Sequence, residues 1–80
     1  MAPDATFREL LDAIADGNID RTLELTDALS SWLKKGGFPP ITIGSAALGH
    51  DWHRHIASEI CNMAMVHARR MATAHAPTDD

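Results

Sequence analysis

The first apolar pattern along the chain has the period of an α-helix. Large apolar side chains separated by three, four and seven residues form one stripe: Phe7, Leu10, Leu11 and Ile14. Pro3 and Asp4 are typical of a helix start, and Gly17 is typical of a helix end. We therefore predict a helix over about residues 4–16.

A second helical pattern follows after a short turn. Asn18 is a favoured N-cap residue, and Asp20 suits the positive end of a helix dipole. Gly36 and Gly37 are typical of a helix stop. A broad apolar arc is formed by Ile19, Leu23, Leu25, Leu29, Trp32 and Leu33. We predict a helix over about residues 19–35.

Residues 10–33, with two apolar stripes around a short turn, resemble one helical hairpin of the tetratricopeptide type. The chain does not repeat this unit at the period of about 34 residues that defines those repeats. The resemblance implies a helical hairpin and slightly favours binding to a protein partner.

Residues 36–49 are predicted to form an irregular connector. Pro39 and Pro40 break helical geometry. Residues 41–43 alternate like a short extended segment, which would either pair with a symmetry mate or lie across the helices. After them, Ser45 is expected to cap a short turn that ends at a glycine; alternatively, the third helix begins there and tolerates that glycine.

The longest helical pattern covers about residues 51–74, followed by a tail at residues 75–80. Its large flank carries bulky side chains: Trp52, Ile56, Ile60, Met63 and Met71. Its small flank carries Ala57, Cys61, Ala64 and Ala68. An arc of roughly 180° is wider than one neighbour needs, so we expect this helix to contact two neighbours.

These patterns predict an all-α fold in one domain, residues 1–80, in which a helical hairpin and a longer third helix form a small bundle. Apolar residues make up 45% of the 80-residue chain, but many of them are alanines. Because such a core is small for a lone chain, we expect oligomerisation to complete it, with a dimer favoured. The expected packed centre consists of Trp32, Trp52, Phe38, Leu29, Ile56, Ile60 and Met63.

Charge is distributed unevenly along the chain. Residues 1–33 contain seven acidic and two basic residues, whereas residues 34–76 contain five basic and two acidic residues. The two parts are electrostatically complementary, so they are expected to pack on each other within one chain or across a symmetric dimer.

Two surfaces are candidates for protein contact. The first, the acidic ridge, consists of Asp20, Glu24 and Asp27. Like charges at this spacing destabilise an isolated helix and favour a basic neighbour, although an ordinary solvated face is the alternative. The second surface, on the otherwise polar side of the third helix, consists of Met65, Val66 and Arg69.

A histidine-rich segment contains metal-ligand residue types: His50, Asp51, His53 and His55. Helical geometry places His53 in the apolar arc and His55 on the opposite side, so these side chains do not converge as a metal site requires. We expect no metal or other cofactor. Buried or interface positions are expected for His53 and His67, and solvated positions for His50, His55 and His75.

No catalytic motif is present. Cys61 is the single cysteine and lies mid-helix among alanines, where a small buried side chain is favoured over a nucleophile. The chain has neither a signal-peptide pattern nor an apolar run of about 18 residues. We expect a cytoplasmic protein without a membrane segment.

The function that these observations favour is a small non-enzymatic protein–protein interaction module that self-associates, such as an adaptor, a regulator or an assembly component. One alternative is a dimeric nucleic-acid-binding regulator that uses the third helix, although the acidic pI of about 5.6 disfavours it. The other alternative is a His-based metal-binding protein.

Overall fold

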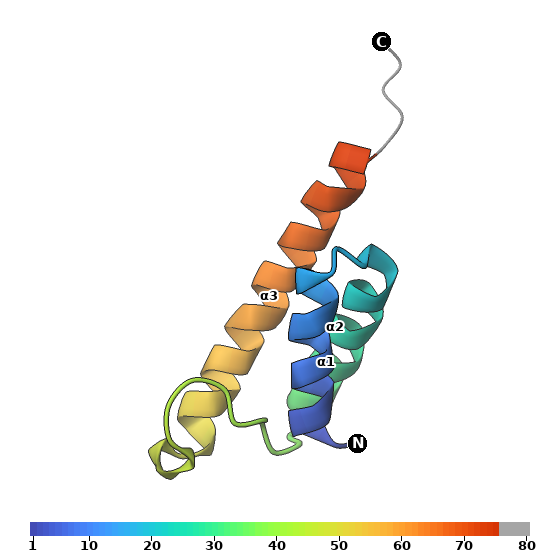
Figure 1. Cartoon of the computed structure of the whole chain (residues 1–80). Coiled ribbons are helices and arrows are strands. Elements are labelled where there is room, and N and C mark those ends of the chain that lie inside the picture. Colours follow the sequence, from blue (N-terminus) through green and yellow to red (C-terminus); the bar gives the residue numbers. More distant parts are fainter. Residues whose placement is uncertain (76–80) are drawn as a thin grey trace.

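The protein is all-helical in residues 1–75, the part that the computed structural model describes (Figure 1). Three α-helices, with one short 3-10 turn (η1) before the last, make up the fold: α1 (Pro3–Ala15), α2 (Ile19–Lys34), η1 (Ala46–Leu48) and α3 (His50–His75). The prediction of an all-α class is confirmed. Most of the expected tail, residues 76–80, lies outside the described residues.

Local signals explain where the helices begin. Pro3 opens α1 without a side-chain cap. Asn18 caps α2, because its Oδ1 accepts a hydrogen bond from the backbone N–H of Arg21 at 3.1 Å. Between them, Gly17 adopts a φ of 71°, in the left-handed region that favours glycine. A Cβ at that position would lie 3.2 Å from the methyl carbon of Met71, so α3 reaches this turn.

The hairpin helix α2 packs against both other helices, whereas α1 and α3 touch each other little. The buried core lies along α2 and contains Phe7, Leu10, Ala13, Leu25, Leu29, Leu33, Ala57, Cys61 and Ala64. The last turns of α3 extend past the turn between α1 and α2 (Figure 1). None of the helices described within residues 1–75 has the length and apolar content needed to cross a membrane.

Helix α3 packs on α2 through its small flank. Ala57, Ala64 and Ala68 are almost completely buried, and Cys61 is buried beside them. Short side chains let two helix backbones approach closely. The contact is also tied by a hydrogen bond of 3.0 Å, which Nη1 of Arg54 donates to the carbonyl oxygen of Leu33 near the end of α2.

The predicted packed centre is wrong in large part. Three of its side chains are exposed: Phe38 (53%), Trp52 (45%) and Met63 (66%). Three are only half-buried: Trp32, Ile56 and Ile60. Leu29 alone is fully buried. For the α3 side chains among them, the cause is that the small flank of α3 packs on α2, while α1 makes few contacts with α3 and leaves the large flank only partly covered.

The connector, residues 35–49, is held against the helices by side chains. His53 is 1% exposed, and its Nδ1 accepts a hydrogen bond of 3.0 Å from the backbone N–H of Thr42. Because that donor requires an unprotonated Nδ1, the ring carries its proton on Nε2 and donates it to the carbonyl oxygen of Ser45 at 2.9 Å. One buried histidine therefore fixes two points of the connector.

Two indoles and one carboxylate hold further points of the connector. Trp32 Nε1 donates to the carbonyl oxygen of Phe38 at 2.8 Å, and Trp52 Nε1 donates to that of Ile43 at 2.8 Å. Asp4 Oδ1 accepts from the backbone N–H of residue 41 at 2.8 Å. Of the two expected placements of residues 41–43, the chain itself shows the one across the helices, and no strand occurs in residues 1–75.

The short turn after the connector's extended part follows the first of the two expected alternatives. Ser45 Oγ accepts a hydrogen bond from the backbone N–H of Ala47 at 3.0 Å and so caps η1. Gly49 ends this turn with a φ of 96°, and α3 begins directly after it. The break between η1 and α3 is therefore built into the backbone at one glycine.

Candidate functional site

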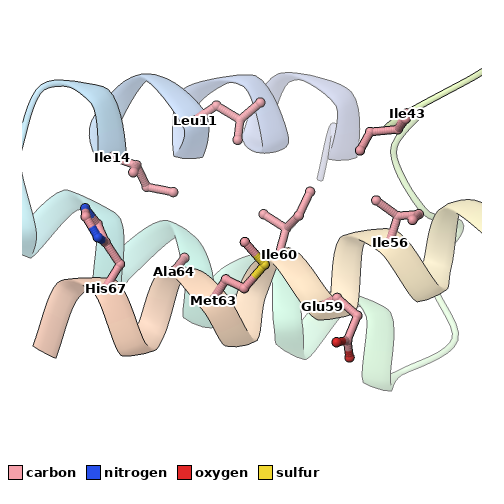
Figure 2. Close-up of a pocket in the computed structure, with 9 residues that line it drawn as sticks. All are labelled: Leu11, Ile14, Ile43, Ile56, Glu59, Ile60, Met63, Ala64 and His67. Atoms are coloured by element: carbon pink, nitrogen blue, oxygen red, sulfur yellow. The ribbon is translucent and has the colours of Figure 1, made fainter. Parts of the chain in front are cut away.

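An apolar groove runs between α1 and α3, on the side where these two helices do not touch (Figure 2). Its volume is about 540 Å³. The residues that line this groove are Leu11, Ile14, Ile43, Ile56, Glu59, Ile60, Met63, Ala64 and His67. The groove follows the large flank of α3, from which Ile56, Ile60 and Met63 line it.

Each wall of the groove comes from a different element. Leu11 and Ile14 point from α1 toward α3, and Ile60 and Met63 point back from the α3 side (Figure 2). The connector contributes Ile43 at one end, where the Trp52 indole holds its carbonyl. Large aliphatic side chains therefore meet across the groove without closing it.

Only two polar side chains line the groove, and they belong to α3. Glu59 points away from the groove and His67 stands near its other end, with Met63 between them along the helix (Figure 2). Both are exposed. A continuous apolar patch with a sparse polar rim is the usual character of a surface that another protein covers.

The acidic ridge lies on α2, which does not line the groove, and its charges are partly balanced within the hairpin of α1 and α2. Arg21 forms an ion pair with Glu24 and a second one, of 2.7 Å, with Glu9 of α1. Hydrogen bonds to Glu24 and then to Glu9 raise the pKa of Arg21. Asp20 and Asp27 are exposed. The pattern predicts a basic neighbour for this ridge from the third helix or from a partner protein, whereas the ion pair that Glu24 makes in the structure comes from Arg21 of α2 itself.

The second predicted contact surface lies on α3, beside the groove. Met65 is half-buried, while Val66 and Arg69 are exposed. Val66 and Arg69 line a shallow depression together with Arg70 and Thr73. This surface is continuous with the groove, because Met63, Val66 and His67 border a further shallow depression that joins them.

The histidine-rich segment does not assemble a metal-binding cluster in the structure. Both ring nitrogens of His53 are engaged with the connector, and His50, Asp51 and His55 are exposed. Across the described residues, no three side chains of the types His, Cys, Asp and Glu gather where they could hold one ion. His53 is buried as predicted, whereas His67 is exposed at the groove; the side chain of His75 lies outside the described part.

Cys61 is a buried thiol in the small flank. Burial raises its pKa, which lowers the thiolate fraction at neutral pH. We expect iodoacetamide at pH 8 to alkylate Cys61 at least about 100-fold more slowly in the native chain than in urea, since reaction needs local opening. Mass spectrometry of a labelling time course measures both rates, and equal rates would contradict the burial of this thiol.

The sequence did not identify the three groove residues that α1 and the connector provide: Leu11, Ile14 and Ile43. The pattern predicts Leu11 and Ile14 in the apolar stripe of the first helix and Ile43 in a short extended segment. The available signal was the width of the apolar arc of α3, which indicated a second neighbour without identifying it. No protein-family model, curated protein or solved structure matches the chain.

Proposed function

We propose that this chain is a small, non-enzymatic protein–protein interaction module that self-associates, and that the groove is its contact surface. One observation carries the proposal: the large flank of α3 lies uncovered beside α1, although its side chains are those of a protein interior. Removing a large aliphatic or methionine side chain from water contributes about 1.5–3 kcal/mol, so covering several of them supplies a strong drive for association.

The small hydrophobic core of the single chain supports the same proposal. Many buried positions along α3 are alanines, which bury little area, while Ile56 and Ile60 are only half-buried and Met63 is exposed. A chain of this size is often completed by a partner subunit. Self-association would add the burial that α1 does not provide.

The nucleic-acid alternative has weaker support. Arg69 and Arg70 are exposed on α3, but the guanidinium of Arg54 donates a hydrogen bond to the carbonyl oxygen of Leu33 near the end of α2. No aromatic side chain accompanies Arg69 and Arg70 on the last turns of α3 to stack on a base. The exposed side chains Met63 and Val66 border the groove and the depression that continues it, which favours a protein partner.

The test replaces one exposed groove side chain with a charge. We expect Met63→Asp to weaken self-association by more than about 30-fold, because a symmetric contact would bury two unpaired carboxylates. Leu48→Asp is the matched control, since Leu48 is also an exposed large apolar residue but lies outside the groove. Sedimentation velocity gives the dissociation constants, and circular dichroism checks that each variant stays helical.

Two results of this experiment would overturn the proposal. One is a wild-type chain that remains monomeric at about 1 mM, a concentration at which even a complex with a millimolar dissociation constant is populated. The other is an equal effect of Met63→Asp and Leu48→Asp, which would show that the groove has no special part in association.

A further inference from the structure

We propose that the groove is filled by α3 of a second copy, lying antiparallel to the first α3, with Met63 of both copies at the two-fold axis. This inference rests on the proposed function and adds the occupant, its direction and its register. In this arrangement, α3 of each copy lies between α1 and α3 of the other, so that both grooves are covered at once.

The position of Met63 on α3 defines the register. Met63 lies at the middle of the 26-residue helix His50–His75, and it is the most exposed large apolar side chain of the described residues. An antiparallel pair centred there overlaps along the whole of α3. It also places Ile60 against Val66 of the second copy, which covers an exposed residue outside the groove.

The charges of α3 define the direction. Both acidic residues of this helix, Asp51 and Glu59, lie in its N-terminal half, together with Arg54, which donates a hydrogen bond to the carbonyl of Leu33, whereas Arg69 and Arg70 lie in its C-terminal half. An antiparallel pair therefore joins ends of opposite charge, and a parallel pair would join ends of like charge. The helix dipoles favour the same direction.

The two polar residues of the groove fit this register. Glu59 and His67 are each four positions from Met63, on opposite sides of it. A two-fold axis at Met63 therefore brings Glu59 of one copy opposite His67 of the other, with Arg70 one turn further along. A carboxylate that faces water in the single chain gains an imidazole and a guanidinium as neighbours, and this occurs twice in the dimer.

Helix α1, which lines the other wall of the groove with Leu11 and Ile14, has a net negative charge. Helix α1 (Pro3–Ala15) contains three acidic residues and one arginine. The half of α3 that would enter the groove of the second copy carries cations and no acidic residue after Glu59 within the described part. The complementarity first seen between two parts of the sequence would thus act between two copies of the chain.

Disulfide cross-linking tests direction and register in the full chain. All variants carry Cys61→Ala, which replaces the native thiol with alanine, the residue type of the other small-flank positions. A disulfide needs Cα atoms about 4.4–6.8 Å apart, so it reports close neighbours only. We expect Met63→Cys to form a disulfide-linked dimer on mild oxidation, and Ser31→Cys, an exposed position on α2, to remain unlinked.

A mixture of two variants tests the register separately. Glu59→Cys and His67→Cys are each expected to stay unlinked alone. When the two are mixed under reducing conditions and then oxidised, we expect a dimer that contains one chain of each, recognised by its mass. A disulfide of Glu59→Cys with itself would indicate a parallel pair and overturn the inference.

A charge exchange gives a readout without cysteine. Glu59→Lys alone and His67→Glu alone are each expected to raise the dissociation constant about fivefold, because each places like charges together at two symmetric contacts. The double variant Glu59→Lys/His67→Glu should return close to the wild-type value. Additive weakening in the double variant would contradict the pairing.

The outcomes separate this inference from the proposed function. A dimer seen by sedimentation that forms none of the expected disulfides would overturn the antiparallel α3 pair and leave the groove as an interaction surface. A monomer under all conditions would overturn both.

Discussion

Replacing His53 with alanine is expected to lower the free energy of unfolding by about 3 kcal/mol, because a buried ring is lost together with its hydrogen bonds to Thr42 and Ser45. The imidazole is almost fully buried and holds the N–H of Thr42 and the carbonyl of Ser45. Its loss leaves a cavity and releases the connector. Chemical denaturation gives the stability, and amide hydrogen exchange at Thr42 reports the released N–H directly.

Two further variants identify the source of that effect. His53→Phe keeps a ring in the buried space but offers no hydrogen bonds, so it should recover part of the loss while Thr42 still exchanges fast. His55→Ala, two positions further along α3 and exposed, should change stability by less than about 0.5 kcal/mol. Equal effects of His53→Ala and His55→Ala would contradict the role assigned to His53.

Replacing Leu29 with alanine is expected to cost about 3–4 kcal/mol of stability, within the range seen for fully buried leucines. Leu29 has no exposed surface and lies on α2, the helix that packs against both others. Its removal therefore weakens both helix contacts of the small core. A domain of this size commonly has only a few kcal/mol to lose, so the variant should be largely unfolded at 37 °C.

The matched control for Leu29 is another leucine that packs against little. Leu48→Ala removes the same atoms from an exposed position in η1. We expect it to cost less than about 1 kcal/mol. Urea unfolding followed by circular dichroism measures both variants, and a similar loss at the two positions would contradict the assignment of the core to α2.

Helix positions could be predicted from the sequence because their signals are local. Pro3, Asn18 and Gly49 act on the backbone next to them, and each stands where a helix or turn begins or ends in the structure. The resulting boundaries lie within one residue of those predicted from the pattern. Local geometry required no knowledge of which helices pack together.

The side of α3 that is buried could not be predicted in the same way. Periodicity gives the width of an apolar arc, but both flanks of α3 lie within one arc. The choice depends on how close α2 can approach, and alanines such as Ala57 and Ala64 allow the closer contact. Because α1 makes few contacts with α3, Met63 stays exposed. The small flank of the apolar arc therefore belongs to the core, and the large flank lines the groove.

The polar contacts of the connector were also beyond a reading of the sequence. The sequence predicts that His53 is buried or at an interface, but two of its hydrogen-bond partners are backbone groups of Thr42 and Ser45, which side-chain chemistry does not identify. Two buried threonines on α2, Thr22 and Thr26, were likewise absent from the predicted apolar arc. The Thr26 hydroxyl is buried without a hydrogen-bond partner among the described residues, next to the buried Leu25 on the packed face of α2.

The most direct test of the central claim is a dilution series followed by methyl NMR, because it reports association and its location together. Our account predicts that lowering the concentration of the wild-type chain from about 1 mM to about 10 µM shifts the methyl signals of Leu11, Ile60 and Met63, whereas the methyl signals of Leu48 do not shift. Self-association would be contradicted if these signals do not move over this range and the mass measured in solution is that of one chain, 8.7 kDa. Shifts confined to α2 would contradict the groove as the contact surface.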